Sequence, residues 1–208
     1  FNANTSQDRT YYYDIFPSNK LELGLWLESE RMLHPVIDQL AVDTQNEVVK
    51  EEKRQSYDRP YGKLLKVLWE NLFKVHPYKD ENIGRMEDLD AATLDEFLAY
   101  FDKYYSPDNA VLIVAGDIEI EETKKLVSKY FSEVKKRPGF TRNFPKETPI
   151  TETEKVTAYD KNIQIPAVLA AYRMPGMAER DAFVLDMIST YLSGGKSSVL
   201  YKKLVDKK

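Results

Sequence analysis

The sequence has no cysteine among its 208 residues. Disulfide bonds, thiolate zinc sites and a cysteine nucleophile are therefore excluded. The compartment stays open, because a cysteine-free chain tolerates both oxidising and reducing surroundings, and the bacterial periplasm and the cytoplasm both fit. Histidine is nearly as scarce, since only His34 and His76 occur and each precedes a proline. A residue before proline is disfavoured in the helical conformation, so we expect both histidines to have structural roles.

Long apolar runs and an excess of one charge are missing as well. The longest apolar run, 110–115, is far shorter than the ~20 residues that a membrane-spanning helix needs. The 30 basic and 34 acidic residues give a net charge of −4 and form no basic block. The charge pattern therefore favours neither nucleic acid nor an anionic membrane as a partner. The 42% hydrophobic and 12% aromatic residues are typical of a globular chain.

The stretch 45–54, with the sequence QNEVVKEEKR, predicts a charged helix. Helical spacing places Gln45, Val49 and Glu52 on one face and turns Glu51 away from it. An apolar patch one turn earlier is then expected to bury Glu52 in part, and a partly buried carboxylate needs a cation, hydrogen bonds or a metal. Taken alone, the stretch also fits a solvated helix face with local ion pairs.

Other motifs follow one another in order along the chain. They include Phe1-Asn2-Ala3-Asn4-Thr5, Leu27-Glu28-Ser29-Glu30-Arg31-Met32, Tyr57-Asp58-Arg59-Pro60-Tyr61-Gly62, His76-Pro77-Tyr78, Ser106-Pro107-Asp108-Asn109, Ala115-Gly116-Asp117 and Leu192-Ser193-Gly194-Gly195-Lys196-Ser197-Ser198. Together with 45–54, the series resembles the M16 family of zinc peptidases, which includes pitrilysin, insulin-degrading enzyme and mitochondrial processing peptidase. The resemblance covers essentially the whole chain and implies an α+β fold in which a mixed sheet packs with helices.

The resemblance also implies a zinc site. In the family, an H-x-x-E-H helix supplies two histidine ligands and a glutamate that acts as general base. A glutamate on a later helix is the third ligand, and water occupies the open position. The match places this third ligand at Glu52, whereas a shift by one residue would select Glu51. The family's supporting glutamate two turns earlier is Gln45 here, which keeps a hydrogen bond and loses a charge.

No H-x-x-E-H occurs in the sequence. We therefore expect a piece of a longer zinc metalloendopeptidase that begins after this motif, with no catalytic residue of its own. By itself it should be inactive and should lack Zn²⁺. The alternative function is a non-catalytic M16-like subunit that binds peptides or partners, although inactive subunits often lose their ligands and Glu52 is present.

The resemblance implies partners too. Asn2 and Ala3 match an edge strand of the family that pairs with an extended substrate through main-chain hydrogen bonds; ordinary edge-strand residues are the alternative. The expected partners are a peptide or unfolded protein substrate and a second M16-like half or subunit, with no nucleic acid and no membrane span.

Composition and periodicity predict the organisation of the chain. Composition indicates a linker at 138–153. The resemblance then implies that residues 1–137 are the remainder of an N-terminal M16 peptidase-like domain and that 154–208 are the start of a second similar domain. Expected strands are 1–5, 9–16, 110–115, 156–159 and 167–172. Expected helices are 18–33 with Ser18 as N-cap, 38–57, 61–73, 93–105 opened by a capping box, 119–131, 181–192 and 197–207, with a loop at 76–90.

Overall fold

A computed structural model describes residues 1–137 and 139–207 of the chain. It divides into two units, Phe1–Gln164 and Ile165–Lys208. Within the described residues, helices are combined with a two-stranded sheet, as an α+β fold requires. The predicted domain limits at 137 and 154 remain a prediction, since the units describe compactness and not family domains.

The chain opens with a β-hairpin made of β1 (Asn2–Thr5) and β2 (Thr10–Tyr13). The strands are antiparallel, with Ala3 opposite Tyr12. Tyr12 also forms a hydroxyl–hydroxyl hydrogen bond with Tyr105, which follows helix α5 (Leu94–Tyr104). This bond ties the hairpin to the rest of its unit. Because the sheet has only these two strands among the described residues, β1 keeps one edge without a strand partner.

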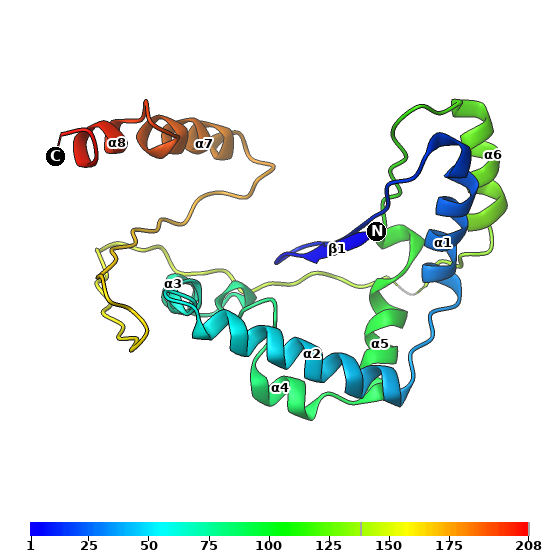
Figure 1. Ribbon diagram of the computed structural model, residues 1–208, viewed down its shortest axis with the longest axis horizontal. Coiled ribbons are helices and arrows are strands. Elements are labelled where there is room, and N and C mark those ends of the chain that lie inside the picture. Colours follow the sequence, from blue (N-terminus) through cyan, green and yellow to red (C-terminus); the bar gives the residue numbers. More distant parts are fainter. Residues whose placement is uncertain (138, 208) are drawn as a thin grey trace. The chain divides into compact units, whose positions relative to one another are not determined.

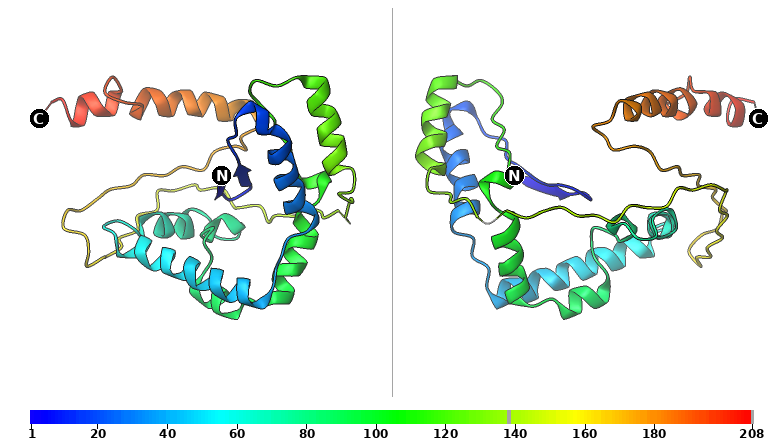
Figure 2. Two further views of the ribbon diagram at one scale, coloured as in Figure 1. Left: turned by 45° about the vertical axis from the view of Figure 1, so that its right-hand side comes forward. Right: turned by 180° about the vertical axis from the view of Figure 1, so that it is seen from behind.

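Helices α1 (Leu21–Leu33) and α6 (Ile120–Phe131) pack side by side (Figures 1 and 2). Leu25 is buried on α1. At one end of the pair, the Glu22 carboxylate accepts hydrogen bonds from Lys129 Nζ at 2.7 Å and the Tyr130 hydroxyl at 2.8 Å. Packing and polar contacts thus join segments that lie far apart in the sequence.

Helix α2 (Gln39–Asp58) is the longest helix and contacts α4 (Met86–Ala91) and α5 (Leu94–Tyr104). Asp38 caps α2 by accepting a hydrogen bond from the Ala41 N–H at 2.8 Å. The capping box predicted for α5 is confirmed: Thr93 and Glu96 bond each other's backbone N–H groups.

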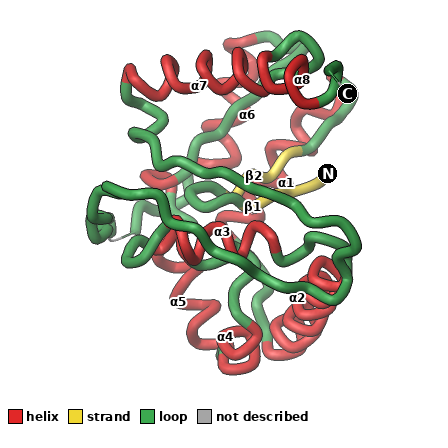
Figure 3. The backbone as a smooth tube through the Cα atoms, turned by 90° about the vertical axis from the view of Figure 1, so that its left-hand side faces the viewer, coloured by secondary structure: helices red, strands yellow, loops and turns green. Residues whose placement is uncertain are grey.

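The remaining helices are α3 (Leu64–Leu72) in the first unit and α7 (Arg180–Ser193) and α8 (Val199–Leu204) in the second. Short 3₁₀ turns, η1 to η3, lie at Ser18–Lys20, Pro77–Lys79 and Pro107–Asn109. The described residues between α6 and α7 form neither helix nor strand, and Figure 3 draws them as loop.

Three predicted strands are not found. Residues 110–115, 156–159 and 167–172 belong to no ladder within the described part of the chain. Val111 and Ile113 are 87% and 74% exposed. A strand needs the N–H and C=O groups of a neighbour, and no described segment provides them here. An apolar run therefore predicted a preference for extended backbone but not a paired strand.

Two local predictions are also wrong. The expected loop 76–90 contains most of α4, a helix too short for its periodicity to stand out. Ser18 opens the 3₁₀ turn η1, and α1 instead starts after Lys20, which makes no side-chain cap. No helix within 1–137 and 139–207 is both long enough and apolar enough to cross a bilayer.

A carboxylate on helix α2

Glu52 lies on an exposed side of α2. The partial burial expected for it is therefore wrong. The buried residues of α2 are Val42, Lys50 and Lys53, and Lys53 is turned by about 100° around the helix axis from Glu52. The adjacent valines, Val48 and Val49, suggested the wrong face. Val48 is 46% exposed, whereas Lys50 and Lys53 are 9% and 5% exposed.

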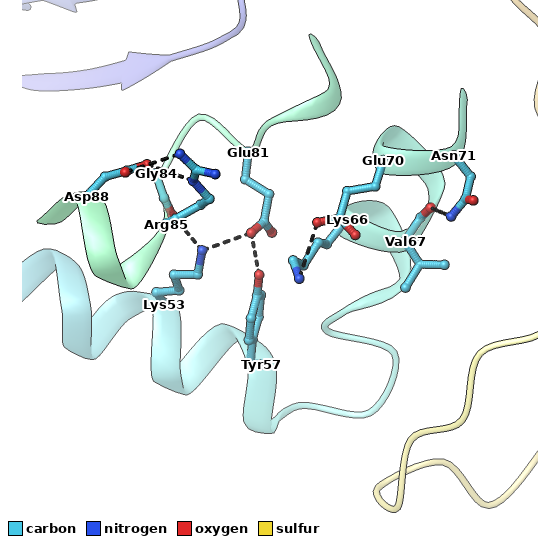
Figure 4. Close-up of polar contacts among 10 residues, drawn as sticks. All are labelled: Lys53, Tyr57, Lys66, Val67, Glu70, Asn71, Glu81, Gly84, Arg85 and Asp88. Carbon is cyan, nitrogen blue, oxygen red and sulfur yellow. Dashed lines mark hydrogen bonds and ion pairs between the residues drawn. The ribbon is translucent and has the colours of Figure 1, made fainter. Parts of the chain in front are cut away.

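Lys53 anchors the buried side of α2 (Figure 4). Its side chain is only 5% exposed, and its Nζ lies 2.9 Å from Glu81 Oε2 and donates to the Gly84 carbonyl oxygen at 2.5 Å. Tyr57, one turn later, donates its hydroxyl hydrogen to the same Glu81 oxygen. Burial, assisted by this hydrogen bond, raises the pKa of Tyr57 above its ordinary value. The ammonium and the carboxylate thereby satisfy each other away from water.

Lys50 and Asn46 extend the same anchoring surface. Lys50 Nζ lies 2.5 Å from Asp90 Oδ1 and 2.8 Å from Glu47 Oε1. The hydrogen bonds to Asp90 and Glu47 raise the pKa of Lys50. Asn46 donates through Nδ2 to the Leu89 carbonyl oxygen at 3.1 Å. These contacts and those of Lys53 fix how α2 is rotated, and hence the direction in which Glu52 points.

The anchoring surface was not predicted from the sequence, although the sequence contains its signal. Asn46, Lys50, Lys53 and Tyr57 recur at the spacing of one helix face. Their long side chains can bury apolar stems and still reach polar partners. A hydrophobicity pattern does not score lysines as buried residues, so it selected a different face.

The adjacent carboxylates of Glu51 and Glu52 differ in their hydrogen bonds. Glu51 accepts from Arg54 Nη1 at 3.4 Å and from Gln55 Nε2 at 3.2 Å. Glu52 takes part in no hydrogen bond or ion pair within 1–137 and 139–207. Gln45 is exposed and lies two turns before Glu52 on the same side of the helix. The side chain that would have to bind a metal is thus the one with no competing cation.

Glu52 fits one position of a zinc site, and the described residues do not supply the others. None of their histidine, aspartate and glutamate side chains forms a group of three or more suited to a metal ion. His34 Nδ1 lies 2.9 Å from Glu30 Oε2. The His76 ring packs against Tyr78 at 4.3 Å between ring centroids, and its Nδ1 accepts the Tyr78 N–H. Both histidines thus have local structural contacts.

Asn2 and Ala3 lie exposed on β1, the strand with an unpaired edge among the described residues. An extended peptide could add to such an edge through main-chain hydrogen bonds. A surface cavity of about 450 Å³ lies elsewhere, beside the ends of α1 and α6 around Met32 and Val134. It contains none of the predicted site residues.

Comparison with known proteins relates this arrangement to peptidases. Residues 91–208 match a family model described as the peptidase M16 inactive domain. The zinc protease PqqE of Helicobacter pylori is 30% identical over 210 residues, which cover 100% of this chain and 47% of that protein. An uncharacterized zinc protease of Mycobacterium leprae is 28% identical over 204 residues, and this alignment covers 98% of this chain and 46% of that protein. The chain spans about half the length of these curated relatives.

Two solved structures of proteases have folds similar to that of this chain. The crystal structure of a protease from Helicobacter pylori superposes with a TM-score of 0.80 at 27% identity, over 99% of this chain and 51% of that one. The first half of the periplasmic protease PqqL from Escherichia coli gives a TM-score of 0.62 at 25% identity, over 71% and 32% of the two chains. Because the family model covers more than half of the sequence and these folds match it, the chain belongs to the M16 peptidase family.

Proposed function

We propose that this chain forms part of a zinc-dependent endopeptidase in which Glu52 is a ligand to Zn²⁺. The observation that carries the proposal is the unpartnered carboxylate of Glu52 on the exposed side of α2, while the buried side is fixed by Lys50 and Lys53. The relatives named as zinc proteases support the reaction class.

Each residue on this helix has a distinct role in the proposal. Zinc, when bound, activates a water molecule and polarises the scissile carbonyl group. Glu52 contributes one of three protein ligands and a negative charge. Gln45 supports it from two turns away as a hydrogen-bonding neighbour, and Lys53 holds the rotation of α2 through Glu81. The two histidine ligands and the general base would come from an H-x-x-E-H helix outside the described residues.

The substrate in this proposal is a peptide or an unfolded protein segment in extended form. It would lie along β1, with Asn2 and Ala3 at the contact, because the free edge of that strand can add one more antiparallel or parallel neighbour. Main-chain bonding of this kind tolerates many side chains, so we expect specificity to come from pockets and not from the edge itself.

A second candidate is a non-catalytic subunit that binds peptides. The observation in its favour is that the family model matched by 91–208 is described as an inactive domain. Glu52 lies outside that match, so both functions could belong to one longer protein: a metal-binding part that includes α2 and an inactive part that follows it.

The two candidates are separated by peptide hydrolysis in the longer protein. A zinc endopeptidase should cleave a fluorogenic peptide, lose activity on treatment with a chelator and recover it on addition of zinc but not of magnesium. A peptide that binds with measurable affinity and is never cleaved, with or without zinc, would favour the non-catalytic subunit.

A further inference from the structure

Three successive backbone N–H groups converge on one carboxylate in the first unit. The amides of Lys74, Val75 and His76 donate to Glu147 Oε1 at N···O distances of 2.8, 2.7 and 2.7 Å. The three amides lie between α3 and the turn η2, and Glu147 follows them by more than seventy residues. Consecutive N–H groups that point to one side form a concave binding site for anions.

Side-chain contacts hold Glu147 from both directions along the chain. Before it, the Phe144 ring lies 5.2 Å from the His76 ring, which itself packs on Tyr78. After it, Lys74 Nζ lies 3.6 Å from Glu154 Oε2. Residues 144–154, here called the strap, are therefore attached to the α3–η2 connection at three points, with the carboxylate in the middle.

The chemistry of the central contact selects a carboxylate. The three N–H groups offer donors only, so the site needs an acceptor, and an ionised acceptor gives the stronger hydrogen bonds. Glu147 reaches the site with one oxygen bonded to all three amides. Glu154, another acid of the strap, does not bond to these amides but pairs with the Lys74 side chain.

We propose that the amides of 74–76 form a carboxylate-binding site that Glu147 occupies in cis, and that this occupancy latches the strap to the first unit. Residues after the strap are attached to the same unit by other contacts, from Lys63 to Asp160 and from Asn162 to Asp58. The latch therefore acts on the strap itself. The proposal is independent of the zinc chemistry.

The test is amide hydrogen exchange on the intact chain, resolved by residue. In Glu147→Ala, the amides of Lys74, Val75 and His76 should exchange at least tenfold faster than in the wild type, and trypsin should cut sooner after Lys146. The matched control is Glu152→Ala, which removes a carboxylate from the same strap and should leave both measurements unchanged. Sodium acetate at about 0.1 M, a concentration suited to a weak site, should slow exchange in Glu147→Ala, whereas chloride at equal ionic strength should not.

Unchanged exchange at the three amides in Glu147→Ala would overturn the latch. An equal effect of acetate and chloride would overturn the carboxylate-binding site. If Glu147→Ala loses its helical circular dichroism, amide exchange is measured on Glu147→Gln instead. The glutamine side chain keeps the size of glutamate and one acceptor oxygen but has no charge. The proposal expects exchange in Glu147→Gln between that of the wild type and full exposure, and exchange as slow as in the wild type would contradict it.

Discussion

At the scale of single residues, Lys53 determines which side of α2 is free. Its ammonium group is nearly excluded from water and is satisfied by Glu81 and the Gly84 carbonyl. Removing the charge would leave the Glu81 carboxylate with the Tyr57 hydroxyl as its one remaining contact in this network. The direction of Glu52 thus depends on a residue that does not itself contact a metal.

We predict that Lys53→Met lowers the free energy of unfolding by about 2–3 kcal/mol, the range for losing hydrogen bonds to a charged, largely buried group. Urea denaturation of the chain measures this. Arg54→Gln is the control, because Arg54 and Glu51 form an exposed pair, and it should change stability by less than about 0.5 kcal/mol. Equal effects of the two substitutions would show that the lysine is not an anchor.

At the scale of elements, the start of α2 was predicted from sequence and depends on one side chain. Asp38 accepts the Ala41 N–H at 2.8 Å. Asp38→Ala should destabilise the chain by about 1 kcal/mol, while Asp38→Ser should retain most of the stability because serine also caps helices. Thermal unfolding compares the two variants. Equal midpoints would mean that the cap contributes nothing measurable.

Helix α5 provides a prediction about pH. Hydrogen bonds from the backbone and side chain of Thr93 hold the pKa of Glu96 below its ordinary value of 4.5. A carboxylate with a lowered folded-state pKa stabilises the fold fully above the unfolded-state pKa, and this contribution is lost as the pH falls through the folded-state pKa.

The thermal midpoint of Glu96→Gln should therefore lie below that of the wild type near neutral pH, and the gap should close as the pH drops below about 4.5. Glu152→Gln, outside the helices, is the control. A gap that stays constant from neutral to acid pH would contradict the capping role of the ionised form.

Periodicity and one capping box predicted most of the helices because these signals are local. The capping box at Thr93 needs only residues within one turn of each other, and so does the cap at Asp38, which was not predicted. The strand expected at 110–115 depends on a neighbouring strand, which sequence pattern does not supply and the described residues do not contain. The same limit applies to Glu147, since no local pattern connects it to amides more than seventy residues earlier.

At the scale of the whole molecule, the second unit has little buried apolar surface. Ala182 is its one buried hydrophobic residue among those described, whereas Phe183, Met187 and Tyr191 on α7 are 67%, 74% and 70% exposed. A segment of this size without disulfides or metal rarely buries enough surface to fold alone. The chain spans about half the length of its curated relatives.

We predict that a peptide of residues 165–208 shows low helicity and no cooperative thermal transition by circular dichroism, because α7 and α8 offer too little mutual packing to offset the loss of conformational entropy. The same measurement on 1–164 serves as the comparison. A sharp melting transition of the isolated peptide would show that the second unit folds independently.

The candidate site combines what the sequence could predict with what it could not. Resemblance to M16 peptidases selected Glu52 over Glu51, but the reason to prefer it on structural grounds appeared only with the contacts of Arg54 and Gln55 to Glu51. The exposure of Glu52 differs from the partial burial expected from Val49, because the helix is rotated by its lysines.

We propose that Glu52 binds the zinc of the longer protein, and its zinc content tests this assignment. The direct measurement is the zinc content, by elemental analysis, of the purified longer protein carrying Glu52→Gln or Glu51→Gln. We predict about one zinc per chain in the wild type and in Glu51→Gln, and loss of zinc in Glu52→Gln, since a neutral amide replaces a carboxylate ligand poorly. Zinc retained in Glu52→Gln and lost in Glu51→Gln would show that Glu51, and not Glu52, is the ligand.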